Sequence, residues 1–168
     1  MQEYKLIGRG EYTKCYRKGL SKYVYLKSVC QVKECMALGW HTASPILPKI
    51  TYSSGGSDPE EYDYKMKYYQ NRGRNFRISS LTPYYRTMYR ELRKLHKDTR
   101  GKEFFEKIMD IKTIKLKDRE AIWDLMYTMR NWVELSEVFF EISPRNVAEH
   151  CGRLILLDCV FIREKKRR

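Results

Sequence analysis

The spacing of apolar residues changes near residue 80, and this change constrains the fold more than any other feature of the sequence. Before it, short runs rich in Tyr, Val and Leu alternate with glycine turns, which is typical of β-strands. The Ser/Gly/Pro-rich segment 53–59 has the composition of a loop, so the strands on either side of it can form a hairpin. We expect strands over residues 3–7, 12–18, 22–29, 49–53 and 62–68, and one short helix over 32–40.

Beyond residue 80 the spacing is helical. Thr82-Pro83 is a helix start signal, and apolar residues then recur every three or four positions. We expect helices over about 83–97, around 104–109, and from 118 along an apolar stripe that ends at 133, followed by strands over 138–142 and 153–158 with a turn at 143–145. The fold class is therefore α+β, with an antiparallel sheet first, then helices and a short hairpin.

The amino-acid composition narrows the classes of molecule that this chain could bind. The 168 residues carry 34 Lys and Arg against 21 Asp and Glu, a formal net charge of +13, which favours nucleic acid, nucleotide phosphates or an acidic protein surface. Five cysteines without a CxxC pair make a poor disulfide framework and a poor zinc site. No apolar run approaches the roughly 18 residues of a membrane span or forms a secretory signal, so we expect no membrane partner and a cytoplasmic location.

The first segment with candidate chemistry is a glycine loop between two expected strands. Gly8 and Gly10 allow the backbone to approach a phosphate chain, and Tyr12 closes the tip of the loop. No helix and no Gly-Lys-Ser/Thr follow, so the segment is neither a dinucleotide fingerprint nor a P-loop. An ordinary glycine-containing hairpin is the alternative.

The second segment is the strand end Val24-Tyr25-Leu26-Lys27, followed by Glu34 in the expected short helix. A strand lysine that contacts nucleotide phosphates needs a carboxylate to hold its ammonium group, and Glu34 or another acid nearby can supply one. An exposed strand lysine is the alternative.

The third segment contains Glu141, then Asn146 five residues later, and Asp158 at the end of an apolar strand. Oxygen-bearing side chains at this spacing can surround one metal-nucleotide group. Asn and Asp are also common at turns and strand ends, which is the alternative.

Together and in this order, the three segments resemble the protein-kinase-like fold, including the reduced kinase-like proteins of tailed bacteriophages and the aminoglycoside and choline kinase relatives. The resemblance implies a sheet lobe over 1–69, a reduced helical lobe over 70–162, a basic tail over 163–168, and Mg-ATP bound between the lobes. It implies that Gly8, Gly10 and Tyr12 form the glycine-rich loop, that residues 62–68 enter the hinge, and that Lys27 contacts phosphates with Glu34 as its partner. Asn146 and Asp158 would hold Mg²⁺.

Two departures from the family concern catalysis. Glu141 stands where the family has its catalytic Asp, and a carboxylate displaced by an ångström can slow a reaction about 10²-fold. Only ten residues follow Asp158, so we expect no activation segment. The resemblance then implies a pseudokinase, of phage type, that modulates a host macromolecule; an active phosphotransferase acting on host proteins and a basic nucleic-acid-binding or inhibitor protein built on the same scaffold are the alternatives.

A basic segment precedes the first long helix. Arg72, Arg74 and Arg77 lie close to Gly73 and Phe76 and form a candidate surface for a host protein or another polyanion. A solvated face is the alternative. No groove-reading or RNA-binding motif is present, so sequence-specific nucleic-acid binding is not expected.

Overall fold

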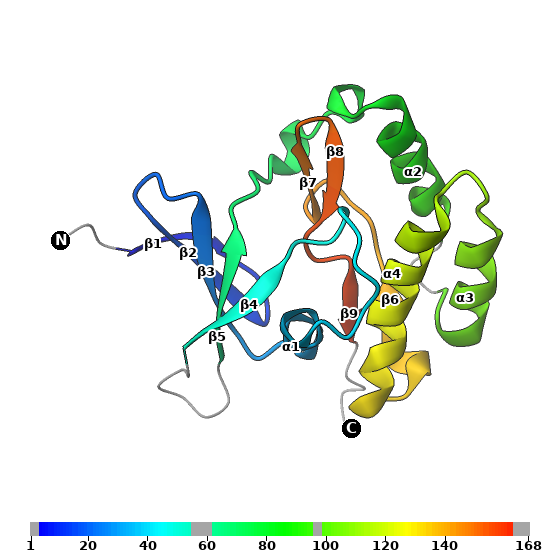
Figure 1. The fold of residues 1–168 in the computed structure, drawn as a ribbon, viewed down its shortest axis with the longest axis horizontal. Helices are drawn as coiled ribbons and strands as arrows, with labels where there is room; N and C mark the ends of the chain where they lie inside the picture. Colours follow the sequence, from blue (N-terminus) through cyan, green and yellow to red (C-terminus); the bar gives the residue numbers. More distant parts are fainter. Residues whose placement is uncertain (1–3, 55–61, 96–98, 163–168) are drawn as a thin grey trace. The chain divides into compact units, whose positions relative to one another are not determined.

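The computed structural model describes residues 4–54, 62–95 and 99–162. The predicted α+β class is confirmed: an antiparallel sheet with one short helix comes first, and helices with short hairpins follow (Figure 1). The chain divides into two compact units, one of residues 1–39 and 48–68 and one of residues 40–47 and 69–168. None of the helices in the described part of the chain combines the length and apolar composition that a membrane crossing requires.

The first unit is built on a five-stranded antiparallel sheet of order β1-β2-β3-β5-β4, with a helix between β3 and β4. All five predicted strands and the predicted helix are present, and residues 55–59 of the predicted loop lie outside the described residues. The elements are β1 (Tyr4–Arg9), β2 (Thr13–Lys18), β3 (Tyr23–Ser28), α1 (Gln31–Leu38), β4 (Ile50–Ser54) and β5 (Tyr62–Lys67).

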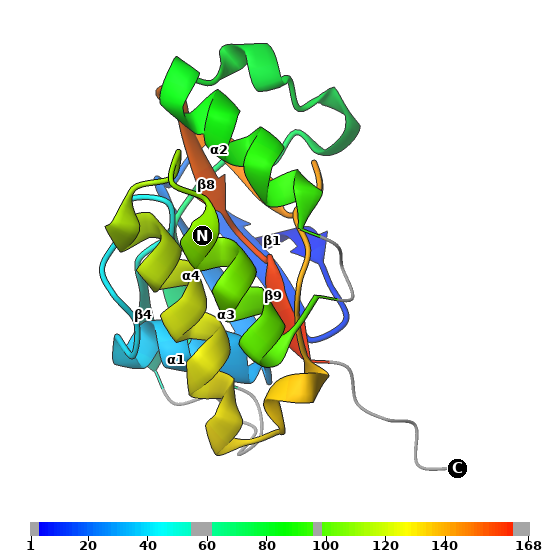
Figure 2. The same ribbon diagram turned by 90° about the vertical axis from the view of Figure 1, so that its right-hand side faces the viewer.

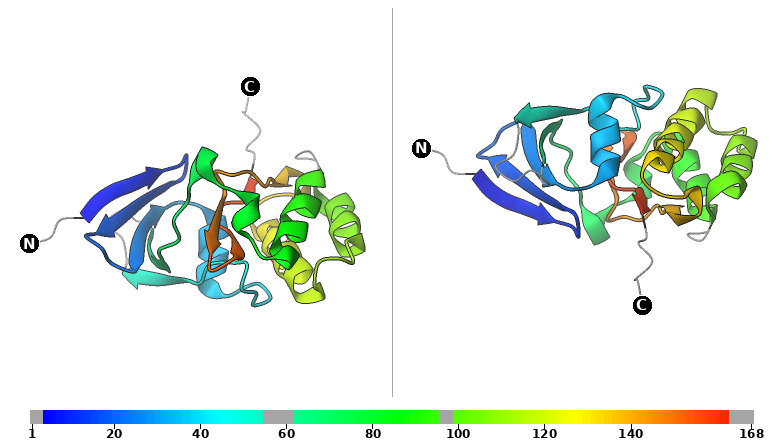
Figure 3. Two further views of the ribbon diagram at one scale, coloured as in Figure 1. Left: turned by 90° about the horizontal axis from the view of Figure 1, so that it is seen from above. Right: turned by 90° about the horizontal axis from the view of Figure 1, so that it is seen from below.

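The two faces of this sheet differ in burial. Along β3, the side chains of Val24, Leu26 and Ser28 are buried while those between them are partly exposed, as expected for a strand with one face in the core. Cys15 pairs with Leu26 and shares its face. Burial raises the pKa of the Cys15 thiol to about 11, and the positive charge of Lys33 on α1 acts in the opposite direction. Helix α1 therefore lies on this side (Figure 3), which we call the α1 face; the other is the open face.

The second unit contains three longer helices, of which α3 and α4 lie side by side (Figure 2). Apolar residues at helical spacing, including Leu92, Phe104, Ile108 and Ile122, are buried, which confirms the predicted stripes. The helices are α2 (Pro83–Lys94), α3 (Gly101–Asp110) and α4 (Leu116–Thr128), with short 3-10 turns over Gly73–Asn75, Ile78–Ser80, Met129–Asn131 and Leu135–Glu137.

A buried carboxylate joins residues 40–47 to this unit. Asp118 of α4 is 1% exposed and accepts hydrogen bonds from the Ser44 Oγ and the Tyr84 hydroxyl, each at 2.5 Å. Desolvation, followed by this hydrogen bond, raises the pKa of Tyr84, so the tyrosine stays a donor. Thr42 donates its amide and its hydroxyl to Asp124, further along α4. Asp118 is thereby satisfied, as buried polar groups usually are, and the partly exposed Asp124 has two donors as well.

The C-terminal strands correct one prediction. The sequence indicated a single hairpin of residues 138–142 with 153–158, but two antiparallel pairs form instead. Strand β6 (Val138–Phe140) pairs with β9 (Val160–Ile162), and β7 (Val147–His150) pairs with β8 (Arg153–Leu156). The reason is the turn at Cys151-Gly152, where both residues have positive φ (52° and 74°), the conformation that closes a two-residue hairpin.

Gly152 provides a test of this turn. A Cβ atom at this residue would lie 2.7 Å from the Thr82 Cγ2 atom, and the Thr82 amide donates to the Gly152 carbonyl at 2.8 Å. We expect Gly152→Ala to lower the free energy of unfolding by about 2 kcal/mol or more, from φ strain and overpacking together. Gly39 has a similar φ (70°), but a Cβ atom there would meet no other atom within 4 Å, so Gly39→Ala should cost only about 1 kcal/mol. Equal losses in chemical unfolding would contradict the role of the Thr82 contact.

Candidate functional site

The main chain of the second unit brings the three predicted residues Glu141, Asn146 and Asp158 together. The amides of Leu157 and Asp158 donate to the Asn146 carbonyl at 2.8 and 3.2 Å. The Glu141 amide donates to the Cys159 carbonyl at 2.9 Å, directly after the β6–β9 pair. Strand pairing on both sides therefore fixes the segments that carry the two carboxylates and the amide.

The loop between Glu141 and Asn146 is a hydrogen-bonded turn. The Asn146 amide donates to the Ser143 carbonyl at 3.0 Å, and Pro144 occupies the second position, where its fixed φ favours the turn. The Asn146 side-chain amide lies 3.4 Å from the Glu141 carbonyl. Glu141 and Asn146 are partly exposed and Asp158 is exposed, so all three side chains can reach a ligand.

Asn71, which the sequence analysis did not single out, holds this turn from outside. Its side-chain Nδ2 donates to the carbonyls of Arg145 and Val147 at 2.8 and 2.7 Å, with a longer contact to Pro144 at 3.4 Å. Its Oδ1 accepts from the Gly73 amide at 2.8 Å. No sequence signal connects Asn71 with a loop more than 70 residues away.

The donor chemistry of the site suits a hard cation. Asn146 and Asp158 carry oxygen ligands of the kind that Mg²⁺ prefers, and their main chains are in direct hydrogen-bond contact. The described residues hold no group of three or more His, Cys, Asp or Glu placed to bind a metal, so transition-metal chemistry has no ligand cluster there. All five cysteines are free thiols.

In the first unit, the predicted glycine loop is a tight β1–β2 turn. The Gly10 amide donates to the Thr13 carbonyl at 2.8 Å, and Tyr12 is 40% exposed near the tip. Neither Gly8 nor Gly10 has a positive φ, and a Cβ atom at either would have its nearest neighbour at 3.8 Å. The chain's own packing therefore does not require glycine at these two positions.

The structure does not bring Lys27 and Glu34 together among the described residues. The Lys27 Nζ lies 3.8 Å from Asp63 Oδ1, its cross-strand neighbour on β5. The Lys27 side chain is 38% exposed and belongs to the open face, because it alternates with buried Leu26 and Ser28. Glu34 lies in the first turn of α1, against the other face.

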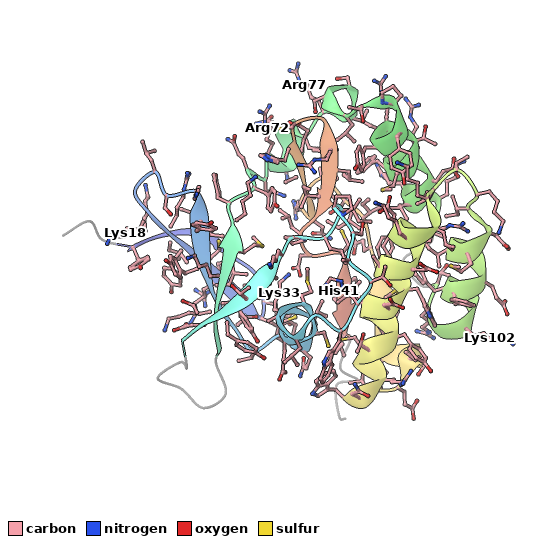
Figure 4. The ribbon with its side chains drawn as sticks, in the orientation of Figure 1. Lys18, Lys33, His41, Arg72, Arg77 and Lys102 are labelled. Atoms are coloured by element: carbon pink, nitrogen blue, oxygen red, sulfur yellow. The ribbon has the colours of Figure 1, made fainter. Side chains whose placement is uncertain are left out.

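A different lysine lies on the α1 face. Lys33 is only 5% exposed, and its charge lowers the pKa of the Cys15 thiol against the effect of burial (Figure 4). Gly8 pairs with Cys15, so the position that lacks a Cβ is on this same face. The sequence does not single out Lys33, because only the placement of α1 shows which of many lysines is buried.

The predicted basic segment is on the surface. Arg72, Arg74 and Arg77 are exposed, and none of them forms an ion pair with another described residue. Figure 4 labels Arg72 and Arg77. Phe76 between them packs on Tyr89 of α2, with ring centroids 5.2 Å apart. The three guanidinium groups are thus presented by a segment fixed at Asn71 and Phe76.

Comparison with known proteins gives matches only among solved structures. No family model and no curated protein matches the sequence. The chain is similar to the crystal structure of aminoglycoside phosphotransferase APH(4)-Ia, with 13% identity and a TM-score of 0.46, over 92% of this chain and 64% of that one. It is also similar to a thermostable mutant of that enzyme in ternary complex with AMP-PNP and hygromycin B, with 12% identity and a TM-score of 0.46, over 96% and 68% of the two chains. The chain thus spans less than two thirds of the length of the first structure.

The contacts of Asn71 predict a local effect on the loop. In Asn71→Ala, the carbonyls of Arg145 and Val147 lose their donor, so we expect a loss of about 1–2 kcal/mol in the free energy of unfolding and faster amide hydrogen exchange over residues 143–148. Exchange in β3 and β5 should not change. Asn75→Ala, at an exposed asparagine in the same segment, is the control; if the two variants exchange alike over 143–148, Asn71 does not hold the loop.

Proposed function

We propose that this chain is a kinase-like protein that binds Mg-ATP and transfers phosphate poorly, that is, a pseudokinase. The observation that supports this most directly is the convergence of Glu141, Asn146 and Asp158 through main-chain hydrogen bonds. In the proposal, Asn146 and Asp158 hold Mg²⁺, which would neutralise phosphate charge when bound. The phage origin and the host macromolecule as partner stay predictions from the sequence.

The glycine loop fits the same proposal. Since neither Gly8 nor Gly10 is required by φ or by internal packing, the absence of side chains there serves something outside the chain. A backbone without Cβ atoms lets a phosphate chain approach closely and accept hydrogen bonds from amides. Tyr12 at the tip can shield the bound group from water.

The lysine in this proposal differs from the one expected from the sequence, because the two lysines lie on different faces of the sheet. A phosphate-binding ammonium group should share the face on which Gly8 lies, and Lys33 does so whereas Lys27 does not. A charge-assisted hydrogen bond between an ammonium group and phosphate oxygens is stronger in a buried environment than at the surface. We therefore assign the phosphate contact to Lys33 and keep Lys27, the candidate from the sequence, as the comparison.

The weak transfer follows from Glu141. Its backbone is fixed by the hydrogen bond to Cys159, so the additional methylene of Glu moves the carboxylate rather than being absorbed by the loop. A general base or orienting group displaced by about an ångström loses on the order of 10²-fold in rate. An active phosphotransferase is the second candidate. It would have to bind the acceptor hydroxyl in a position that matches the displaced Glu141 carboxylate.

Nucleotide binding tests the proposal. We expect saturating Mg-ATP, at a hundredfold excess over Kd, to add about 2.7 kcal/mol to the free energy of unfolding, and ATP with EDTA to add much less. Lys33→Met should weaken Mg-ATP binding about tenfold or more, since a charge-assisted hydrogen bond contributes about 1.5–3 kcal/mol. Lys27→Met, which removes an equal charge from the open face, is the matched control.

The outcomes separate the alternatives. Weakening by Lys27→Met and not by Lys33→Met would return the phosphate contact to Lys27. If titration calorimetry detects no ATP binding to the folded protein, the kinase-like scaffold serves only to bind a macromolecule.

Replacing Glu141 with the shorter Asp tests whether the position of this carboxylate causes the weak phosphate transfer. We expect Glu141→Asp to raise the rate of phosphate release from labelled ATP by up to about 10²-fold, because the carboxylate regains the reach typical of the family. Asp158→Asn introduced into Glu141→Asp should remove the gain. A gain that survives Asp158→Asn would indicate a contaminating ATPase and not this site.

A further inference from the structure

The open face of the sheet in the first unit carries an unusual set of side chains. On β1, β2, β3 and β5, alternation along the strands and the cross-strand register place twelve described residues on this face. They are Tyr4, Leu6 and Arg9 on β1; Lys14, Tyr16 and Lys18 on β2; Tyr23, Tyr25 and Lys27 on β3; and Asp63, Lys65 and Lys67 on β5.

Cations dominate this face. Arg9, Lys14 and Lys27 are direct cross-strand neighbours in a row over β1, β2 and β3, and Asp63 on β5 ends the row. Directly opposed like charges destabilise a sheet, and adjacent strands are only about 4.8 Å apart. Asp63 is the one carboxylate among the twelve residues, and its contact with Lys27 is long, at 3.8 Å. The row therefore places three cations side by side, an arrangement that suits the regularly spaced charges of a polyanion.

Tyrosines alternate with these cations. Tyr16 and Tyr25 are cross-strand neighbours, and the rings of Tyr4 and Tyr25 meet edge to face with centroids 5.2 Å apart. Tyr4 is 53% exposed and Tyr16, Tyr23 and Tyr25 are partly exposed. The Lys65 Nζ lies 4.4 Å from the Tyr23 ring centroid and so reaches that ring's π-face. The exposed parts of the four rings offer planar area for stacking, and at Tyr23 this cation lies beside that area.

We propose that the open face binds single-stranded nucleic acid, with bases stacked on tyrosine rings and phosphates on the rows of Lys and Arg. Stacking and charge together favour this occupant over the others. An acidic protein surface would neutralise the cations but has few planar groups to stack on four tyrosines. A duplex presents phosphates but keeps its bases stacked inside, so the rings would contribute nothing.

The proposed site does not read sequence. Every base has a π-face, and the face offers few side chains that could recognise base edges. This agrees with the absence of a recognisable base-reading motif. The site is independent of the proposed nucleotide function, which uses the α1 face, and its test leaves Lys27 unchanged so that the two can fail separately.

The test is fluorescence anisotropy of the full chain with labelled oligouridine and oligodeoxythymidine about 12 nucleotides long, and with a duplex of equal length. Both single strands should bind more tightly than the duplex. Tyr25→Leu should weaken single-strand binding about tenfold without changing its salt dependence, and Tyr25→Phe should restore it, because stacking needs the ring and not the hydroxyl.

A second set of variants tests how much the lysine charges contribute to single-strand binding. The double change Lys14→Gln with Lys65→Gln should reduce the slope of log affinity against log salt by about 1.4, since each phosphate contact on a single strand contributes about 0.7. Lys5→Gln with Lys102→Gln is the matched control, because Lys5 shares the face of Arg17 on the other side of the sheet and Lys102 is exposed on α3 (Figure 4). Circular dichroism confirms that each variant is folded. Equal affinity for the duplex, an unchanged affinity in Tyr25→Leu, or an equal effect of the control pair would overturn the proposal.

Discussion

The main-chain carbonyl of Asn146 holds the candidate site together. It accepts the amides of Leu157 and Asp158, and the Cys159 thiol lies 3.5 Å away. These contacts join the residue before β7 to the residues after β8. Beyond them, β6 pairs with β9. Backbone groups make these bonds whatever the side chains are, so the geometry of the site is independent of its chemistry.

Polar side chains from distant segments complete the second unit. Asn71 donates hydrogen bonds to main-chain carbonyls at the start of β7 and just before it. Asp118 accepts hydrogen bonds from the hydroxyls of Ser44 and Tyr84. Each is a donor or acceptor that would be costly to leave unpaired, which makes the arrangement specific as well as stable. The basic segment around Arg72 thus has a rigid backbone although its guanidinium groups are exposed.

The first unit separates two kinds of cation by the face they occupy. Lys33 is buried on the α1 face beside Cys15, whereas Lys14 and Lys27 form a row with tyrosine neighbours on the open face. In the two proposals, the buried Lys33 contacts a single phosphate group and the open-face cations contact an extended polyanion.

The sequence by itself determined the element order, the α+β class and the spacing of Glu141, Asn146 and Asp158, because the periodicity of burial and the turn chemistry of Pro144 and Gly152 are local properties of the chain. It did not predict β7 or β9, since strands of three or four residues are too short for a period to be read. Tertiary structure alone decided that Lys27 pairs with Asp63 and that Lys33 is buried. Strand register and helix placement set the face and the partner of each side chain, and both depend on residues far apart in the chain.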